Sequence, residues 1–427
     1  MISPLRRIGP AFIVGACIIG PGSVTLMSKT GAQYGYSMLW LAILTGALMA
    51  GFIALFMRWG IYVDHTVMGL VAERLTRPVA ALGGIVLASS NVAFQFGNNL
   101  GVSAAMELVV PDIDIRLWPV FFTAASIVFM FGLKHIYRAV EGLMTVFLVL
   151  MFLAFLANLV LARPDLISIV RGSFVPQLPP GDEGVDWITI GGLVATTFIL
   201  VAALFQSYLV KAKGWTAENL PSATLDTVLA SVIYTLIGCV IMATAATVIY
   251  PDGTITSAAD MASQLEKLFG PAAQMVFAVG FGAAAFSSFL TNALVGGVLL
   301  CDGFGLGGQL ESKATKVLAA LILVVGMLTA IAILQQERQA AAAPSTASDE
   351  ATEKPAGSQL KVQAIAVGQA TTLLAVPLGA IVTILVLFDR RANANRPLPL
   401  PAKLFAIAGL LVLLSTAAVT YEKLFGG

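Results

Sequence analysis

The first apolar run of the sequence carries an interruption that could form a binding site. Gly20-Pro21-Gly22-Ser23 falls in the middle of this run. Proline removes a backbone donor and clashes with the preceding turn, whereas glycine tolerates unwound geometry. Backbone groups freed at membrane depth must face protein or a wet cavity, and many secondary transporters build their substrate site from such discontinuous helices. The motif therefore indicates either a substrate site or an ordinary proline kink.

Uncharged polar side chains form a second group of candidates. In the run over 79–105, Asn91, Gln95 and Asn98 recur at helical spacing and so lie on one side of a helix. Such amides either hold neighbouring helices together or line a cavity. Gln206 and Gln369 are single amides in otherwise apolar runs. The polar residues of the run over 271–303 favour helix packing, and they are Ser287, Ser288, Thr291 and Asn292.

Several groups that enzymes and pumps need are missing from the sequence. No Asp or Glu lies in the central third of an expected span, which argues against a proton pump. The sequence has no Walker loop, HExxH cluster or nucleophile–base pair, so we expect no enzyme activity and no cofactor. Cys17, Cys239 and Cys301 stand singly in apolar runs, which supports neither a disulfide nor a zinc site. The net charge of +1 gives no reason to expect a nucleic-acid partner.

The composition indicates which elements position these residues. Hydrophobic residues make up 58% of the chain and charged residues 11%, against roughly 25% charged residues in a soluble domain. A helix needs about 20 apolar residues to cross a bilayer. We therefore expect an all-α protein with about eleven transmembrane spans, over 8–30, 37–57, 79–105, 117–133, 139–161, 188–212, 224–249, 271–303, 314–334, 361–388 and 403–424.

Charge and loop composition indicate the topology. Lys and Arg are more numerous in the loops that share a side with the N-terminus, which places that terminus in the cytoplasm. The segment 162–187 is expected to be an external loop, and the Ala-, Ser- and charge-rich segment 335–359 a flexible external loop. We predict a multi-pass, monomeric protein of the cell (inner) membrane, with the lipid bilayer and a small solute or ion as its partners.

Four stretches resemble one family of membrane transporters. The sequence GPGSVTLMSKTGAQYGYSMLW, followed by RAVEG, FGAAAFSSFLTNALVGGVLLCDGF and GQATTLLAVPLGAI, is similar to the Nramp-type metal transporters. The resemblance implies the LeuT-type fold of the APC superfamily, in which five spans are followed by an inverted repeat of five more and one extra helix. Residues 1–161 would form the first repeat, 188–388 the second, and 403–424 the extra span. The substrate site would lie between the broken spans one and six.

The same resemblance shows that the site has been rebuilt. The family's metal-binding Asp and Asn fall on Gly20 and Ser23, and its Met-Pro-His motif falls on Ile199-Leu200-Val201. A later His falls on Gln206, and the acidic pair of span three falls on Asn91 and Phe94. Only Gln369 is retained among the polar site residues. The residues expected to bind substrate are Gly20, Gly22, Ser23, Thr196, Ile199, Gln206 and Gln369, with Thr25, Asn91 and Gln95 lining the cavity and no charged metal ligand.

Three functions are compatible with this sequence. The first is secondary transport of a divalent cation such as hydrated Mg²⁺, without strong proton coupling. The second is transport of a neutral or carboxylate-bearing organic solute such as an amino acid, because a helix that starts at an unwound motif offers free N–H groups to a carboxylate. The third is an Nramp-like receptor that transports nothing. Span six should be less unwound than in relatives, because no Pro or Gly occurs from Leu193 to Lys213.

Overall fold

A computed structural model describes residues 9–133, 136–177, 185–251, 253–342, 356–394 and 396–426. Over these ranges the fold is built from helices alone. The first half comprises α1 (Pro10–Ile18), α2 (Pro21–Tyr34), η2 (Gly35–Met38), α3 (Leu39–Tyr62), α4 (Val67–Arg74), α5 (Arg77–Val109), α6 (Leu117–Gly132), α7 (Ile136–Ala162) and α8 (Leu166–Phe174).

The second half has a similar order of long and short helices. It comprises α9 (Trp187–Thr197), α10 (Leu200–Lys213), η4 (Ala217–Asn219), α11 (Leu220–Val248), α12 (Ala258–Ser263), α13 (Glu266–Phe269), η5 (Gly270–Ala272), α14 (Ala273–Gly303), α15 (Lys313–Ala342), α16 (Ala356–Thr371), η6 (Thr372–Ala375) and α17 (Val376–Phe388), followed by α18 (Leu400–Phe425).

Each of the eleven expected spans coincides with a helix or a pair of helices. Within the described ranges, eight helical stretches are long and apolar enough to cross a membrane, and Leu117–Gly132 is a shorter apolar helix. Large apolar side chains such as Val128, Val279 and Leu411 are exposed on the outside of the bundle. Such an apolar exterior suits hydrocarbon rather than water.

Two expected loops are partly helical. The segment 335–359 was expected to be a loop throughout, but α15 continues to Ala342 and α16 begins at Ala356, while 343–355 lies outside the described residues. The expectation was wrong at both ends because Ala- and Gln-rich sequence has high helix propensity. The segment 162–187 contains α8, whose first turn is capped by the carboxylate of Asp165.

Two spans are broken in their middle. A break in span one is confirmed, but it lies at Ile19 and Gly20 and not over the predicted Gly20 to Ser23, because Pro21 opens α2. The first position of a helix suits proline because its missing N–H is not needed there. The second break leaves out Phe198 and Ile199 between α9 and α10. Each break leaves two residues outside the helices. That span six is less unwound here than in related proteins stays a prediction.

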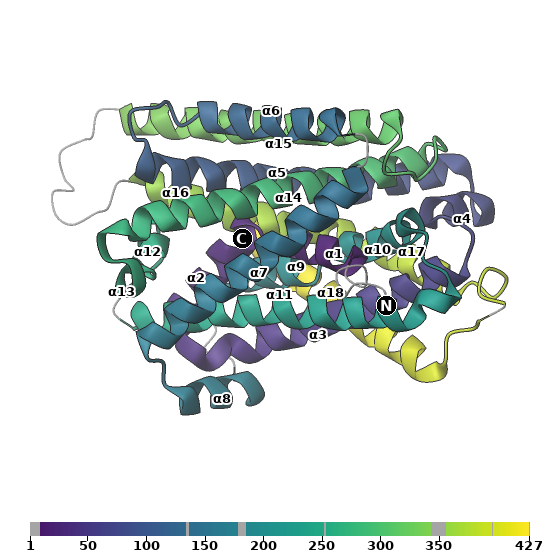
Figure 1. Ribbon diagram of the computed structural model, residues 1–427, viewed down its shortest axis with the longest axis horizontal. Coiled ribbons are helices and arrows are strands. Elements are labelled where there is room, and N and C mark those ends of the chain that lie inside the picture. Colours follow the sequence, from purple (N-terminus) through teal and green to yellow (C-terminus); the bar gives the residue numbers. More distant parts are fainter. Residues whose placement is uncertain are drawn as a thin grey trace.

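The half-helices produced by the two breaks pack across one another at the centre of the bundle. α1 packs against α10, and α2 packs against α9. The long helices α5 and α14 lie alongside this group and pack against each other over most of their length, with α15 and α6 as an outer layer (Figure 1). The start of α1 and the short helix α4 lie towards one end of the long axis, and α8, α12 and α13 lie towards the other (Figure 1).

Candidate functional site

The first break is closed by a serine hydroxyl. Ser23 Oγ accepts a hydrogen bond from the amide of Gly20 at 3.0 Å and donates to the carbonyl of Ile18. These are backbone groups that the interrupted helix leaves without partners. Ser23 is buried, so its hydroxyl is committed to the backbone in this conformation.

Gly20 packs tightly against the two long central helices. A Cβ atom at this position would lie 2.6 Å from Ser288 Oγ on α14 and 3.3 Å from Asn98 Oδ1 on α5. The same two side chains are hydrogen-bonded to each other at 3.0 Å. Asn292 also donates to Ser288 Oγ at 2.9 Å, and Cys17 Sγ donates to Asn292 Oδ1 at 3.0 Å. This network joins α1, α5 and α14, and it occupies the space into which a side chain at position 20 would project.

Gln369 lies directly against the start of α2. A Cβ atom at Gly22 would lie 2.4 Å from Gln369 Nε2, and one at Gly97 of α5 would lie 2.3 Å from it. The amide of Gln369 therefore fits between two glycine backbones. Gln369 is 1% exposed, and neither its Oε1 nor its Nε2 has a hydrogen-bond partner. A buried amide without partners is costly, so it marks a place where a polar ligand could bind.

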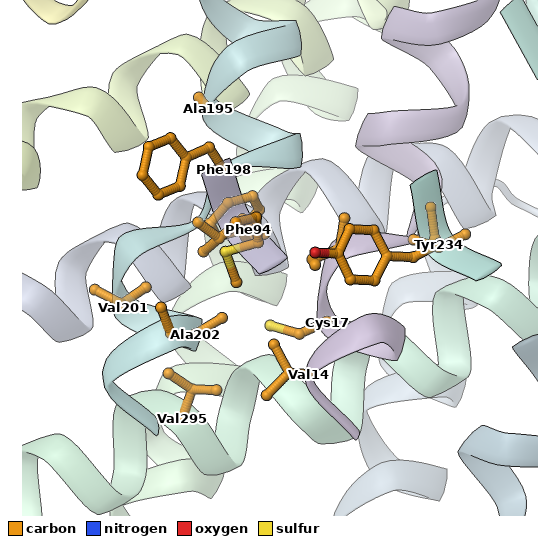
Figure 2. Close-up of a cluster of buried hydrophobic side chains, with 14 of the residues drawn as sticks. Val14, Cys17, Phe94, Ala195, Phe198, Val201, Ala202, Tyr234 and Val295 are labelled. Atoms are coloured by element: carbon orange, nitrogen blue, oxygen red, sulfur yellow. The ribbon is translucent and has the colours of Figure 1, made fainter. Parts of the chain in front are cut away.

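The second break is surrounded by apolar side chains. A cavity of about 20 Å³, which is room for about one water molecule, is bounded by Phe94, Phe198, Ile199 and Val201, with Ser90 and Thr372 as its polar residues. Figure 2 shows Phe94, Phe198, Val201 and Ala202 gathered close to Val14 and Cys17 of α1. The centre of the molecule is therefore mostly hydrophobic in this conformation.

The other candidate residues are distributed around these two breaks. Thr196 Oγ1 donates to the Leu193 carbonyl at 3.1 Å. Gln206 is fully buried, and both its polar atoms lack partners. It follows Ile199 by seven residues, roughly 10 Å along the axis of α10. Thr25 is fully buried in α2, and its hydroxyl has no partner.

The amides of α5 serve mainly as connections. Asn91 Nδ2 donates to the Leu87 carbonyl on its own helix, and its Oδ1 has no partner. Gln95 Nε2 donates to the Phe289 carbonyl of α14 at 2.6 Å. From α5 the cavity is lined by Leu87, Ser90 and Phe94 instead. These amides were expected either to hold helices together or to line a cavity. The hydrogen bond of Gln95 holds α5 against α14.

The ends of α2 and α9 are joined by an ion pair. Lys29 Nζ lies 2.7 Å from Asp186 Oδ2, and it also donates to Thr189 Oγ1 at 2.7 Å. The Tyr34 hydroxyl accepts from the Asp186 amide at 2.7 Å. Burial opposes ionisation of Asp186, but hydrogen bonds from Lys29 and Thr189 outweigh it and hold the pKa of this carboxyl below its ordinary value.

The site contains no cluster of metal-binding side chains. Over the described ranges, no three His, Cys, Asp or Glu residues come together in a group that could hold a metal ion. The neutral oxygens near the breaks come from amides, hydroxyls and backbone. Sequence reasoning missed the apolar walls formed by Phe198 and Val201, although their aromatic and branched types next to the expected site were a visible signal.

Solved structures share this arrangement of helices. The Eremococcus coleocola manganese transporter, solved with an aromatic bis-isothiourea compound, superimposes with a TM-score of 0.82 at 14% identity, covering 98% of this chain and 86% of that one. MhsT in complex with L-phenylalanine gives a TM-score of 0.56 at 14% identity, covering 100% and 99%. The chain therefore shares the LeuT-type fold with these proteins.

The family follows from the sequence. Residues 11–343 match the natural resistance-associated macrophage protein-like (Nramp) family, and the chain belongs to that family. It is 29% identical over 338 residues to the divalent metal cation transporter MntH of Deinococcus radiodurans, which covers 76% of this chain and 75% of the relative. The MntH of Yersinia pestis is 25% identical over 313 residues, covering 70% and 75%.

Proposed function

We propose that this chain is a secondary transporter that moves a divalent cation with much of its water shell, with Mg²⁺ as the first candidate, and without strong proton coupling. The observation that carries this proposal is the unpartnered amide of Gln369 against the start of α2. An amide oxygen can accept a hydrogen bond from a metal-bound water. The cargo class is supported by the relatives, which are named divalent metal cation transporters.

The neutral site explains why the ion would stay hydrated. At about 4 Å and an effective dielectric of about 20, one carboxylate and a divalent ion attract by roughly 8 kcal/mol. Gly20 and Ser23 supply no such charge. Ile199 offers no soft sulfur that would favour Mn²⁺ or Fe²⁺ over hard ions. Mg²⁺ gives up water reluctantly and usually keeps several waters when bound, so it suits weak contacts from neutral oxygens.

The weak proton coupling follows from the residues along the route. A proton crosses a bilayer through Asp, Glu or His side chains. Asn91, Phe94, Val201 and Gln206 stand at the four positions where the family resemblance places titratable groups. None of these side chains takes up a proton near neutral pH.

The apolar walls favour a second candidate function. Phe94, Phe198 and Val201 form a hydrophobic lining at the second break, between α9 and α10. The first turn of a helix attracts anionic groups through its free N–H groups and its dipole. A small organic solute with a carboxylate could place that group at Gly20 to Gly22 and its apolar part against the lining.

Uptake into liposomes distinguishes these functions. Purified protein is tested with Mg²⁺, Mn²⁺ and a panel of amino acids, with a pH dye inside the vesicles. We expect saturable Mg²⁺ uptake that falls about tenfold in Gln369→Ala, as expected for the loss of a hydrogen bond from a buried site. Gln33→Ala, which removes an exposed amide on the same helix α2, is the matched control and should transport normally.

Other outcomes would contradict the proposal in different ways. Uptake of an amino acid instead of Mg²⁺ would establish the second candidate. Acidification of the vesicle interior that scales with Mg²⁺ uptake would overturn the absence of proton coupling. Folded protein that takes up none of these solutes would favour the receptor function.

A further inference from the structure

The first half of the first broken span is held at its outer tip by a buried carboxylate. Asp226 of α11 accepts hydrogen bonds from the Gly9 amide at 2.6 Å and from the Ala11 amide at 2.8 Å. Asp226 is 0% exposed. The first N–H groups of a helix have no partner within the helix and carry the positive end of its dipole. Asp226 therefore supplies a favourable anionic partner for the N-terminus of α1, and we call this interaction the α1 contact.

The second half of the other broken span is held in a similar way. The Tyr208 hydroxyl of α10 donates to Asp302 Oδ2 at 2.6 Å, and Asp302, at the end of α14, is 4% exposed. The same carboxylate accepts from Thr66 Oγ1 at 2.8 Å and from the Met68 amide at 2.9 Å, at the start of α4. We call this interaction the α10 contact. It joins a half-helix to two elements that are not interrupted.

The two contacts act at the same end of the molecule. α1 and α10 pack against each other, and both run from the central breaks towards the end where α4 lies (Figure 1). Each half-helix ends at non-helical residues in the centre, Ile19 and Gly20 for α1 and Phe198 and Ile199 for α10. A few residues at the end of an element are enough to absorb the backbone rotation of a hinge. Each half-helix thus has non-helical residues suited to a hinge at its central end and a carboxylate contact away from that end.

We propose that Asp226 and Asp302 are positioning residues that keep the α4 end of the transporter closed, and that opening of this end requires both contacts to separate. A buried carboxylate that loses its hydrogen-bond donors is strongly unfavourable unless water replaces them. The contacts therefore favour two states, one closed and dry and one open and hydrated. The inference does not depend on which solute is carried.

Cys17 provides a native probe of this opening. It lies near the central end of α1, is 3% exposed, and donates to Asn292 Oδ1. In a Cys239→Ala, Cys301→Ala background it is the remaining cysteine of the chain. A membrane-impermeant maleimide is added to one side of the proteoliposomes at a time. The rate at which it alkylates Cys17 reports how often the end of the transporter on that side opens.

Conservative substitutions test each contact separately. Asp226→Asn removes the charge from the α1 contact, and Tyr208→Phe removes only the hydroxyl from the α10 contact, so the latter variant is expected to fold even if the former does not. We expect each to speed alkylation of Cys17 about tenfold from the α4 side, and the double variant to speed it more. Asp165→Asn is the matched control. The carboxylate of Asp165 also caps a helix, but this helix is α8, which lies towards the opposite end from α4.

Three results would overturn the proposal. The first is an unchanged alkylation rate in folded Asp226→Asn and Tyr208→Phe proteins. The second is an equal increase in Asp165→Asn, or an equal increase from both sides, since either would show general loosening. The third is an increase in one of the two variants alone, because the proposal requires both contacts to hold the same end closed.

Discussion

At the scale of single residues, Ser23 shows how one hydroxyl stabilises an interrupted helix. Its oxygen lies between the amide of Gly20 and the carbonyl of Ile18. Side-chain caps of this kind contribute about 1 kcal/mol. The polar character of Ser23 is therefore structural in this conformation, while its expected part in substrate binding remains a prediction.

Replacing Ser23 with alanine should destabilise the protein measurably. We expect Ser23→Ala to lower the free energy of unfolding by about 1–2 kcal/mol, because two buried backbone groups lose their partner. Ser28→Ala is the control, since Ser28 lies on the same helix, is buried, and has a hydroxyl without a partner. Denaturant unfolding in detergent measures both. Equal losses in the two variants would contradict the role of the Ser23 bonds.

Some residue-level features could be predicted from the sequence, and others could not. Gly20-Pro21-Gly22 predicts a break, because glycine and proline are unfavourable in the interior of a helix. Asp226 gave no such signal, because its partners are the amides of Gly9 and Ala11, more than 200 positions away in the chain. Pairings of this length depend on the tertiary arrangement, which local patterns do not contain.

At the scale of elements, close helix packing depends on a few glycines. α2 and α11 approach so closely at Gly31 that a Cβ atom there would lie 2.1 Å from the Met242 carbonyl oxygen. The obstacle is backbone, so it cannot rotate away as a side chain would. The half-helix α2 is thereby held against a continuous span along its length.

A methyl group at Gly31 should therefore be strongly destabilising. We expect Gly31→Ala to cost about 1–3 kcal/mol of unfolding free energy through overpacking. Gly280→Ala on α14 is the control, since a Cβ atom there meets no atom within 4 Å. It should be neutral or stabilising by up to about 1 kcal/mol because alanine favours the helix. Thermal unfolding of both variants in detergent checks this, and a neutral Gly31→Ala would refute the packing argument.

The break in span six was the element least visible in the sequence. No Pro or Gly interrupts 193–213, yet the helix stops at Phe198 and Ile199. Thr197 Oγ1 donates to the Leu193 carbonyl at 2.7 Å, and hydroxyls that bond back to their own helix compete with its regular hydrogen bonds. The two adjacent threonines Thr196 and Thr197 are therefore a weak signal, which tertiary packing turns into a break.

At the scale of the whole molecule, the family resemblance predicted the fold better than any local pattern did. The broken spans, the order of helices and the apolar exterior all agree with it. The interior of the site could not be predicted as well, because the cavity depends on how Phe94, Phe198 and Val201 pack against one another. Shape of this kind arises only when distant segments meet.

The ion pair between α2 and α9 predicts how the stability of the molecule depends on pH. The pKa of Asp186 is lowered from an ordinary value of 3.8, so its contribution is fully present above that value and is lost as pH falls through the lower, folded-state pKa. The difference in unfolding temperature between the wild type and Asp186→Asn should stay constant from about pH 7 to 5 and shrink below about pH 4. Lys29→Met should raise the pKa of Asp186 towards its ordinary value and so make this loss smaller. A difference that shrinks between pH 7 and 5 in the wild type would contradict the assignment.

The packing around Gly20 also limits which side chains can be engineered into the site. A Cβ atom at this position would lie 2.6 Å from Ser288 Oγ, so a single substitution that introduces a side chain such as aspartate here carries a packing cost. The two atoms nearest to that Cβ position both belong to Ser288, and the next belongs to Asn98, so a smaller residue at position 288 would relieve most of the clash. An attempt to engineer a metal ligand at position 20 should therefore begin at position 288.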